Sequence, residues 1–448
     1  MEKWRIINCH NLQDNFNINN IKNVFNNNVD KEIVLCTGQV QSGKTKNIFA
    51  CVDEALLKLD FHIAIIFAGT NNDLYNQTED RLLGQKKEQY EYIFKNNLKN
   101  RNYKEGRKYV ISILKNCKGL EDTLEFIYSI DLKNLKVLII DDEADYASVN
   151  ISRDKKSKIY EKICELYNKI YKGKLLQVTA TPFANIISNK SLELKANRVV
   201  CWSTYDDYFG LVKFDELKKD KYKIVPSKKE TKENYKSIEE TIFYFISTII
   251  NNYDFLGLKS NFQELSCLIN IDDDTTWHDE ISKNIDKIVH DLYYYGSEKF
   301  YNDYIDKSIN WNDYNNLLKD LISKKLTCIT FNGNNNRINK KQFNIYVSGI
   351  KASRGFTFKN LICELILNSP ENRIAIDVLL QRARWFGDRK AIIDYMKVFM
   401  NQWIYNGLNE AIDYVNLLTV GNHDIDSLYN KILDLDRIKQ IVKSTNKE

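Results

Sequence analysis

The first half of the chain repeats one pattern of hydrophobic and polar positions. A short run of β-branched and other apolar residues is followed by a polar or glycine-containing turn, and then by a longer stretch with helical spacing. This alternation is typical of a parallel α/β sheet, in which helices connect successive strands. The runs are apolar at nearly every position, as expected for strands that helices cover on both faces. The predicted strands are Glu32–Thr37, His62–Ala68, Tyr109–Leu114, Val137–Ile140 and Leu175–Val178.

The pattern changes between Phe214 and Glu240, where charged residues dominate and apolar periodicity is weak. Segments of this kind typically connect domains, so we predict a charged linker at residues 214–240; a loop that contacts nucleic acid is the alternative interpretation. A second α/β series follows the linker. Its predicted elements are strands at Leu265–Ile271, Thr327–Phe331, Phe343–Val347 and Leu361–Leu367 and a helix at Ile374–Ala383. The sequence therefore predicts two tandem α/β domains, at residues 1–213 and 241–448.

Composition and charge narrow the class of protein. Of the 448 residues, 43% are hydrophobic and 28% are charged, which is close to the average of folded globular proteins. The 65 basic and 60 acidic side chains leave a net charge of +5, which does not by itself indicate a nucleic-acid or membrane partner. The longest apolar stretch, Thr241–Ile250, is about half a membrane span, and the nine cysteines include no Cys-x-x-Cys pair. We therefore expect a cytoplasmic protein with no membrane partner, in which any basic site is local.

A phosphate-binding loop motif follows the first predicted strand. Residues Gly38–Thr45 read Gly-Gln-Val-Gln-Ser-Gly-Lys-Thr and match the pattern G-x-x-x-x-G-K-[ST]. In this motif the glycines allow backbone N–H groups to surround phosphates, and the helix that follows presents its positive N-terminus to them. Lys44 is predicted to reach the β- and γ-phosphates of ATP, and the Thr45 hydroxyl to bind Mg²⁺. The remaining predicted nucleotide contacts in the loop are Gly38, Gln41, Ser42 and Gly43.

An acidic cluster ends the strand predicted at Val137–Ile140, because Asp141, Asp142 and Glu143 follow the apolar run directly. If folding brings this cluster beside the phosphate loop, Asp142 can hold Mg²⁺ and Glu143 can act as the general base for the attacking water. A solvated turn or a helix N-terminus is the simpler interpretation of acids at such a place. The presence of the phosphate loop in the same domain favours the catalytic interpretation.

Taken together, the motifs resemble those of superfamily-two helicases. Asp142-Glu143-Ala144-Asp145 reproduces the signature of DEAD-box helicases, and Thr179-Ala180-Thr181-Pro182 resembles the motif that couples hydrolysis to domain movement. Ser348–Phe358 resembles the fifth helicase motif and Gln381–Arg389 the sixth. The resemblance implies coupling roles for Thr179 and Thr181. It also implies two tandem RecA-like P-loop NTPase domains with parallel sheets, and with ATP and Mg²⁺ in the cleft between them.

A narrower resemblance is to bacterial and phage helicase-like ATPases with a Z1 domain, which are often described as endonucleases and are linked to anti-phage defence. It rests on Ala68–Leu82, on Ser353-Arg354-Gly355-Phe356-Thr357 and on Arg384-Trp385-Phe386-Gly387. It implies that Arg384 is the arginine finger that neutralises charge on the γ-phosphate, with Arg389 as a second candidate. It also implies that Gln381 contacts the nucleotide. For each arginine, a surface salt bridge is the alternative interpretation.

The resemblance further implies contacts with a nucleic-acid strand. In this architecture the strand crosses the tops of both domains, where backbone amides, hydroxyls and cations can contact phosphates. A solvated loop or a helix cap is the alternative interpretation of each residue. The implied contact residues are Gly69, Thr70, Asn72, Gln77, Ser353 and Arg354.

We therefore expect a nucleic-acid-dependent ATPase of the helicase type, which translocates on or remodels DNA in phage defence. DNA rather than RNA is expected from the resemblance alone. Two alternatives are an ATP-gated interaction module for a partner protein and an ATPase subunit that works with a partner nuclease or defence protein. The chain itself is not expected to cut DNA, because its Glu-x-Lys triplets at Glu193 and Glu216 are not accompanied by the paired acids of a nuclease site.

Overall fold

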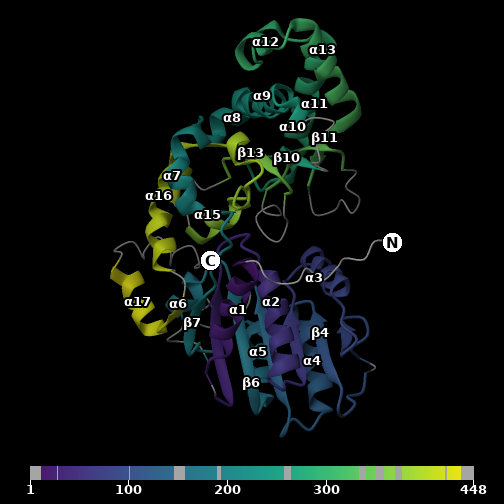
Figure 1. The fold of residues 1–448 in the computed structure, drawn as a ribbon, viewed down its shortest axis with the longest axis vertical. Coiled ribbons are helices and arrows are strands. Elements are labelled where there is room, and N and C mark those ends of the chain that lie inside the picture. Colours follow the sequence, from purple (N-terminus) through teal and green to yellow (C-terminus); the bar gives the residue numbers. More distant parts are fainter. Residues whose placement is uncertain are drawn as a thin grey trace. The chain divides into compact units, whose positions relative to one another are not determined.

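The computed structural model describes residues 12–27, 29–99, 101–145, 157–188, 193–256, 264–331, 340–349, 358–368, 376–418 and 421–434. The chain divides into two compact units (Figure 1). The first unit comprises Met1–Asp206 and Tyr414–Glu448, and the second comprises Asp207–Asp413. Two of the predicted polymer contacts, Ser353 and Arg354, lie outside the described residues.

The first unit is built on a sheet whose described strands run in the order β16-β7-β1-β6-β5-β2-β4-β3. All neighbouring strands are parallel except β16, which pairs antiparallel with β7. The strands are β1 (Lys31–Thr37), β2 (Ile63–Phe67), β3 (Tyr90–Phe94), β4 (Lys108–Ile113), β5 (Lys136–Asp142), β6 (Lys172–Thr179), β7 (Arg198–Cys201) and β16 (Gly421–His423). All five strands predicted in the first half are therefore confirmed.

Helices cover this sheet on both faces, as the continuous apolar runs predicted. Alternate strand residues such as Val34 and Ile140 pack with residues of α1, α2 and α3 in one buried cluster. Their neighbours Leu35 and Ile139, which point to the opposite face, are equally buried. The helices, several of which lie along the strands in Figure 1, are α1 (Leu12–Phe25), α2 (Lys44–Asp53), α3 (Asn72–Gly84), α4 (Cys117–Tyr128), α5 (Lys158–Lys169), α6 (Phe183–Ser188) and α17 (Ile425–Asp434).

The second unit contains a parallel sheet in the order β11-β12-β10-β13-β15-β9. A separate antiparallel pair joins β8 to β14. The strands are β8 (Tyr208–Phe209), β9 (Tyr222–Ile224), β10 (Leu265–Asn270), β11 (Leu326–Thr330), β12 (Phe343–Val347), β13 (Leu361–Ile366), β14 (Gly387–Asp388) and β15 (Lys397–Met400). The four strands and the helix predicted for the second series are present, and the predicted fold class of two tandem parallel α/β units is confirmed.

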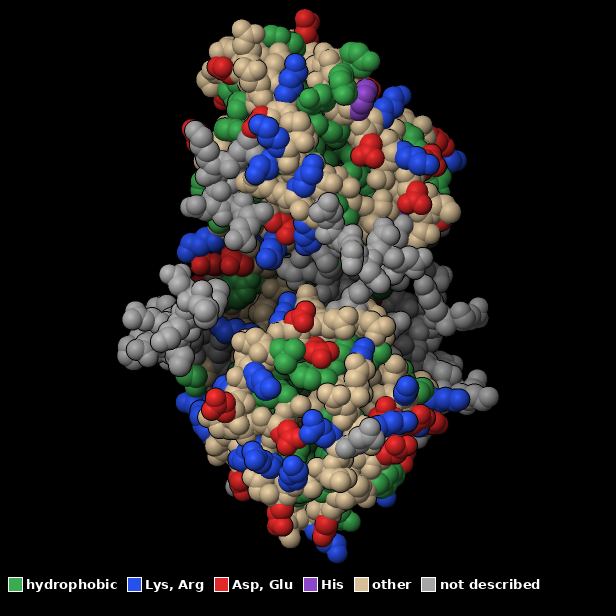
Figure 2. All heavy atoms as spheres, turned by 90° about the vertical axis from the view of Figure 1, so that its right-hand side faces the viewer, with side chains coloured by type: hydrophobic (Ala, Val, Ile, Leu, Met, Phe, Trp, Pro, Cys, Tyr) green, Lys and Arg blue, Asp and Glu red, His purple; other side chains and the backbone are tan. Residues whose placement is uncertain are grey.

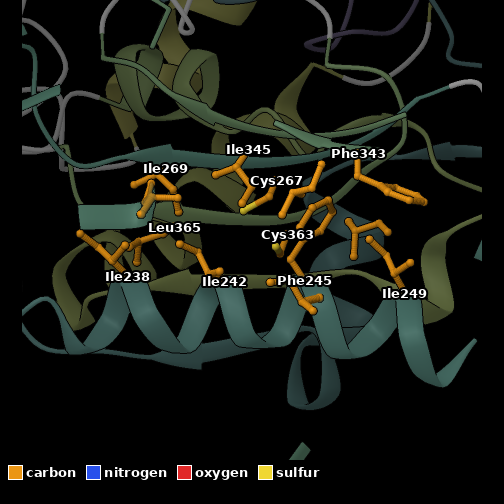
Figure 3. Packing of buried hydrophobic residues seen from close by; sticks show 14 of the residues in the cluster. Ile238, Ile242, Phe245, Ile249, Cys267, Ile269, Phe343, Ile345, Cys363 and Leu365 are labelled. Carbon is orange, nitrogen blue, oxygen red and sulfur yellow. The ribbon is translucent and has the colours of Figure 1, made fainter. Parts of the chain in front are cut away.

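Helix α9 (Lys236–Asn251) forms much of the second core. Its residues Ile238, Ile242, Phe245 and Ile249 recur at helical spacing and point towards the sheet, where they meet residues of β10, β12 and β13 (Figure 3). The other helices of this unit are α7 (Leu211–Lys221), α8 (Lys228–Asn234), α10 (Tyr253–Leu256), α11 (Thr275–Tyr295), α12 (Glu298–Tyr304), α13 (Trp311–Asp320) and α15 (Ile376–Arg382); α16 (Gln402–Leu417) contains the boundary between the units.

The division between the units differs from the predicted domain boundaries. The segment 214–240, which we expected to be a charged linker, instead contributes helices and strand β9 to the second unit. Three of its apolar side chains explain this: Phe214, Val225 and Ile238 are buried, whereas Glu216, Lys229 and Lys236 are exposed. Residues 414–448, which we placed in the second domain, belong to the first unit because β16 pairs with β7.

Among the described residues, no helix has the length and apolar character needed to cross a membrane. On the face drawn in Figure 2, the described Lys and Arg side chains are interspersed with Asp and Glu side chains. This mixture agrees with the small net charge of the sequence. Any contact with a polyanion on this face would therefore depend on individual groups rather than on a broad field of one sign.

Candidate nucleotide-binding site

The predicted phosphate loop lies between the carboxyl end of β1 and the start of α2. The Gly38 N–H donates to Thr179 O at 3.2 Å, and the Ser42 N–H donates to Gln39 O at 3.2 Å, which folds the loop back on itself. Gly43 has φ +84, in the left-handed region that favours glycine, and it precedes the first helical residue, Lys44. Gln41 also has a positive φ, of 58. The loop therefore ends directly at a helix N-terminus, the arrangement that binds phosphates in proteins.

The first glycine position of the motif is restricted by crowding. A Cβ atom on Gly38 would lie 3.1 Å from both Lys44 Cγ and Ser42 Oγ. The Lys44 side chain lies over the loop, because its Nζ donates to Gln39 O at 3.3 Å. The lysine is thus placed at the loop that would hold the phosphates it is predicted to contact.

The acidic cluster forms a turn at the carboxyl end of β5. Parallel pairing places β6 between β1 and β5, so the phosphate loop and the acidic turn lie at the same edge of the sheet. The net effect of the surroundings is to raise the pKa of Asp142 to about 7. Burial and the neighbouring Glu143 charge raise this pKa, and the Lys44 and Lys115 charges offset part of the rise. The two predicted catalytic groups, Lys44 and Asp142, are therefore brought close enough to interact.

The backbone of the acidic turn is held in an uncommon conformation. Glu143 has φ 55, in the left-handed region that a residue with a side chain seldom adopts. Its N–H donates to Asp142 Oδ1 at 3.0 Å, and the next residue, Ala144, donates to Val178 O of β6 at 2.9 Å. Such a conformation persists only when its surroundings fix it, and it is most common at functional sites.

The last acid of the motif joins the predicted coupling residues. Asp145 accepts hydrogen bonds from the hydroxyls of Thr179 and Thr181 through its two carboxylate oxygens, at 2.8 and 3.0 Å. The Thr181 N–H also donates to Thr179 Oγ1 at 3.0 Å. All three side chains are buried. The structure thus joins the acidic turn to the segment that follows β6.

The residues at this edge of the sheet fit ATP with Mg²⁺. Mg²⁺ is usually held by one or two protein oxygens together with substrate phosphates and water, so a cage of protein carboxylates is not required. The described residues contain no cluster of three or more His, Cys, Asp or Glu side chains that could form such a cage. Thr45 Oγ1, next to Lys44 on α2, and the Asp142 carboxylate supply the donor types that this binding mode needs.

An arginine that had no predicted role also reaches the site. Arg81, near the end of α3, donates from Nη1 to Thr45 Oγ1 at 3.2 Å. Burial lowers the pKa of Arg81, and the nearby Asp142 charge raises it. Arg81 therefore lies beside both of the groups predicted to bind Mg²⁺. Its only signal in the sequence was its place within the segment Ala68–Leu82.

The predicted polymer contacts of the first unit lie in one loop and the helix that follows it. Gly69 and Thr70 follow β2 at the same edge of the sheet, and Asn72 begins α3, where Gln77 also lies. The Asn72 amide oxygen accepts from Lys95 Nζ at 3.0 Å. Gly69 has φ +76, and its carbonyl accepts the Lys115 N–H at 2.8 Å. The roles of these four residues stay predictions.

In the second unit, Gln381, Arg384 and Arg389 lie at the end of α15 and in the loop after it. Arg384 Nη1 donates to Gln381 O at 3.1 Å, and the Arg384 N–H donates to Glu364 Oε2 at 3.0 Å. Arg389 donates to the carbonyls of Trp385, Arg384 and Phe386 at 3.0 to 3.1 Å. The Arg389 guanidinium thus connects three carbonyls of this loop, and Arg389 is buried rather than placed at the surface.

Glu364, on β13, was not singled out in the sequence. It is fully buried, and this burial raises its pKa to about 8, although the Arg384 and Arg389 charges lower it. The sequence around Glu364 does not predict that its carboxylate accepts a hydrogen bond from the backbone N–H of Arg384, 20 residues later.

Family comparisons divide the chain in the same way as its motifs. Residues 7–184 match the family described as type III restriction enzyme, res subunit, and residues 237–419 match the Z1 domain. The chain combines a superfamily-two helicase-like domain with a Z1 domain. The helicase-like domain contains the phosphate loop and the acidic turn, and the Z1 domain contains Gln381, Arg384 and Arg389. The resemblance inferred from the motifs is thereby confirmed.

The whole chain also resembles solved helicase structures at low sequence identity. One is S. cerevisiae Dbp5 bound to RNA and ADP BeF3, with 12% identity, a TM-score of 0.45, and coverage of 93% of this chain and 90% of that one. Another is Mss116p bound to single-stranded RNA and AMP-PNP, with 14% identity, a TM-score of 0.45, and coverage of 89% and 71%. No curated protein matches the sequence.

Proposed function

We propose that this protein is a nucleic-acid-dependent ATPase that hydrolyses ATP with Mg²⁺ in order to translocate on or remodel DNA in phage defence. The observation that carries the proposal is the meeting of the phosphate loop and the acidic turn at one edge of the first sheet, where Lys44 and Asp142 interact. Bound Mg²⁺ would neutralise charge on the β- and γ-phosphates.

The residues of the helicase-like domain have separable tasks in this proposal. Backbone N–H groups of the loop and the N-terminus of α2 bind the phosphates, and Lys44 contacts the terminal ones. Glu143 directly follows Asp142 at the carboxyl end of β5. Its carboxylate accepts a proton from the attacking water in this proposal. The hydroxyls of Thr179 and Thr181 donate hydrogen bonds to Asp145, which lies just after this turn. In this proposal the two threonines therefore couple hydrolysis at the turn to domain movement.

DNA as the polymer is supported by the description of the matched family as a restriction enzyme subunit. RNA is the alternative polymer, so the choice must be tested directly. The loop after β2, with Gly69, Thr70 and Asn72, is the proposed contact in the first unit. Contacts of this kind recognise phosphates rather than bases, so binding should be tolerant of sequence and sensitive to salt.

The deciding experiment is one ATPase assay with no polymer, single-stranded DNA, duplex DNA and RNA, each at several salt concentrations. We expect DNA to stimulate hydrolysis and the stimulation to fall as salt rises. Stronger stimulation by RNA would overturn the DNA assignment alone. Hydrolysis that no polymer stimulates would overturn the proposal and favour the ATP-gated interaction module. The Lys44→Ala variant is the control, because contaminating ATPases would survive that substitution.

A further inference from the structure

Lys115 is a fully buried lysine that none of the motifs contains. It follows β4, and its side chain has no exposed surface. Its ammonium group donates to Asp141 Oδ1 at 2.9 Å, to Asp142 O at 2.8 Å and to Glu143 O at 2.8 Å. An ammonium has three donors, and the three acceptors are consecutive residues of the acidic turn.

The position of Lys115 in the sheet explains why a long cationic side chain is needed. β2 lies between β4 and β5, so the ends of β4 and β5 are separated by two strand spacings, about 10 Å. The backbone N–H of Lys115 donates to Gly69 O at 2.8 Å, which anchors the lysine to the loop after β2. From this anchor the side chain reaches across the end of β2 to the turn after β5.

The contacts with the two carbonyls bear directly on the geometry of Glu143. The φ of Glu143 is 55, so this peptide needs support from its surroundings. This φ is the rotation about the N–Cα bond of Glu143. Lys115 binds the carbonyl on each side of that bond, that of Asp142 and that of Glu143 itself. The ion pair with Asp141 places the ammonium group, because both side chains are excluded from water.

We propose that Lys115 is a positioning residue for ATP hydrolysis, which holds the Asp142–Glu143 turn in the conformation that directs the Glu143 carboxylate towards the attacking water. The inference rests on the proposed ATPase function. Lys115 does not touch the nucleotide in this proposal. Its removal should therefore affect turnover and not ground-state binding, because a misplacement of about 1 Å at a catalytic group can cost about 10²-fold in rate.

The test uses the full chain and four variants. Lys115→Met removes the ammonium group at similar size, Lys115→Arg keeps the charge, and Lys115→Met combined with Asp141→Asn avoids leaving a buried carboxylate without its partner. Lys118→Met is the matched control, because Lys118 is an exposed lysine three positions later on α4. ATP affinity, kcat and hydrogen exchange at the Glu143 and Ala144 amides are measured for each, the exchange in the absence of nucleotide.

We expect Lys115→Met to keep ATP affinity, to lose about 10²-fold in kcat and to exchange faster at Glu143 and Ala144. Lys115→Arg should recover part of kcat. The double variant should recover thermal stability but not kcat, because the two carbonyls still lack their donor. Lys118→Met should match the wild type in every measurement.

Three results would overturn the proposal. They are a wild-type kcat in Lys115→Met, a parallel loss of kcat and ATP affinity in the double variant, and unchanged exchange at Glu143 and Ala144 in Lys115→Met. The exchange measurement needs no turnover. If the wild type failed to hydrolyse ATP, the proposed function would fail, and the exchange rates alone would still decide whether Lys115 holds the turn.

Discussion

At the scale of single residues, the proposed function assigns phosphate binding and the activation of water to different groups. Lys44 lies on the phosphate loop, whereas Glu143 lies on a turn beyond it, at the end of a different strand. If Lys44 contributes to ground-state binding and Glu143 to the chemical step, as proposed, their substitutions should have different kinetic effects.

We expect Lys44→Ala to weaken ATP binding and Glu143→Gln to keep ATP binding while nearly stopping turnover. The amide introduced by Glu143→Gln cannot act as a base, and loss of the Glu143 charge removes one cause of the raised pKa of Asp142. Equilibrium binding of a fluorescent ATP analogue and single-turnover hydrolysis would measure the two effects. Wild-type hydrolysis in both variants would exclude this site.

Glu364 gives the stability of the second unit a pH dependence. Its pKa is raised to about 8 in the folded state, whereas the ordinary value is about 4.5. Between these two pH values the folded state keeps the proton and the unfolded state loses it, so the unfolding free energy should fall as pH rises from about 4.5 to 8. Glu364→Gln keeps an acceptor for the Arg384 N–H but cannot ionise.

The difference in unfolding free energy between Glu364→Gln and the wild type should therefore grow with pH and level off above about 8. Its size should be on the order of a few kcal/mol, since one pKa unit corresponds to about 1.4 kcal/mol. Urea unfolding at pH 5, 6, 7 and 8 would measure it. The control is Glu298→Gln, an exposed glutamate on α12, which should show no such trend. A constant difference across pH would contradict the prediction.

At the scale of elements, the sequence predicted the buried strands well and the short ones poorly. Strands such as β1 and β5 are continuous apolar runs because helices cover both of their faces. The strands β9 and β16 have three residues each, and the pairing partners β15 and β7 specify them more than their own composition does. The segment 214–240 was predicted to be a linker for the same reason, because the pairing of its strand β9 with β15 leaves little signal in its own composition.

The same difference applies to the site. The phosphate loop and the acidic turn were predictable because their chemistry requires particular residues at fixed spacing along the chain. Lys115, Arg81 and Glu364 were not, because each acts on residues that only the fold brings near. A single lysine or glutamate in a chain rich in both carries no signal of its own.

The loop after β2 offers a prediction for polymer binding. Gly69 has φ +76, and a Cβ atom there would lie 2.9 Å from Leu74 Cδ1, so Gly69→Ala strains the backbone of the loop and must shift the Leu74 side chain. We expect weaker binding of single-stranded DNA with unchanged ATP affinity in the absence of DNA. Gly84→Ala, at the end of the same helix, is the control because a Cβ atom there meets nothing within 4 Å. Equal DNA affinity of the two variants would remove this loop from the proposed interface.

At the scale of the whole molecule, the predicted catalytic groups come from both units. Lys44, Asp142 and Glu143 belong to the helicase-like domain, whereas Arg384 belongs to the Z1 domain. If Arg384 is the arginine finger, hydrolysis requires the two units to act together. The bonds of Arg389 to the carbonyls of residues 384–386 then serve to fix the backbone that carries Arg384.

Arg384→Ala should spare ATP affinity and lower kcat by about 10³- to 10⁵-fold, because an arginine finger stabilises charge that develops in the transition state. Lys390→Ala is the matched control, since it removes an exposed cation of the same loop, which pairs with Asp207 at 3.1 Å. Thermal unfolding would show whether the Arg384→Ala chain remains folded, and Arg384→Lys would keep the charge without the guanidinium fork. A folded Arg384→Ala chain with wild-type turnover would mean that Arg384 is not the arginine finger.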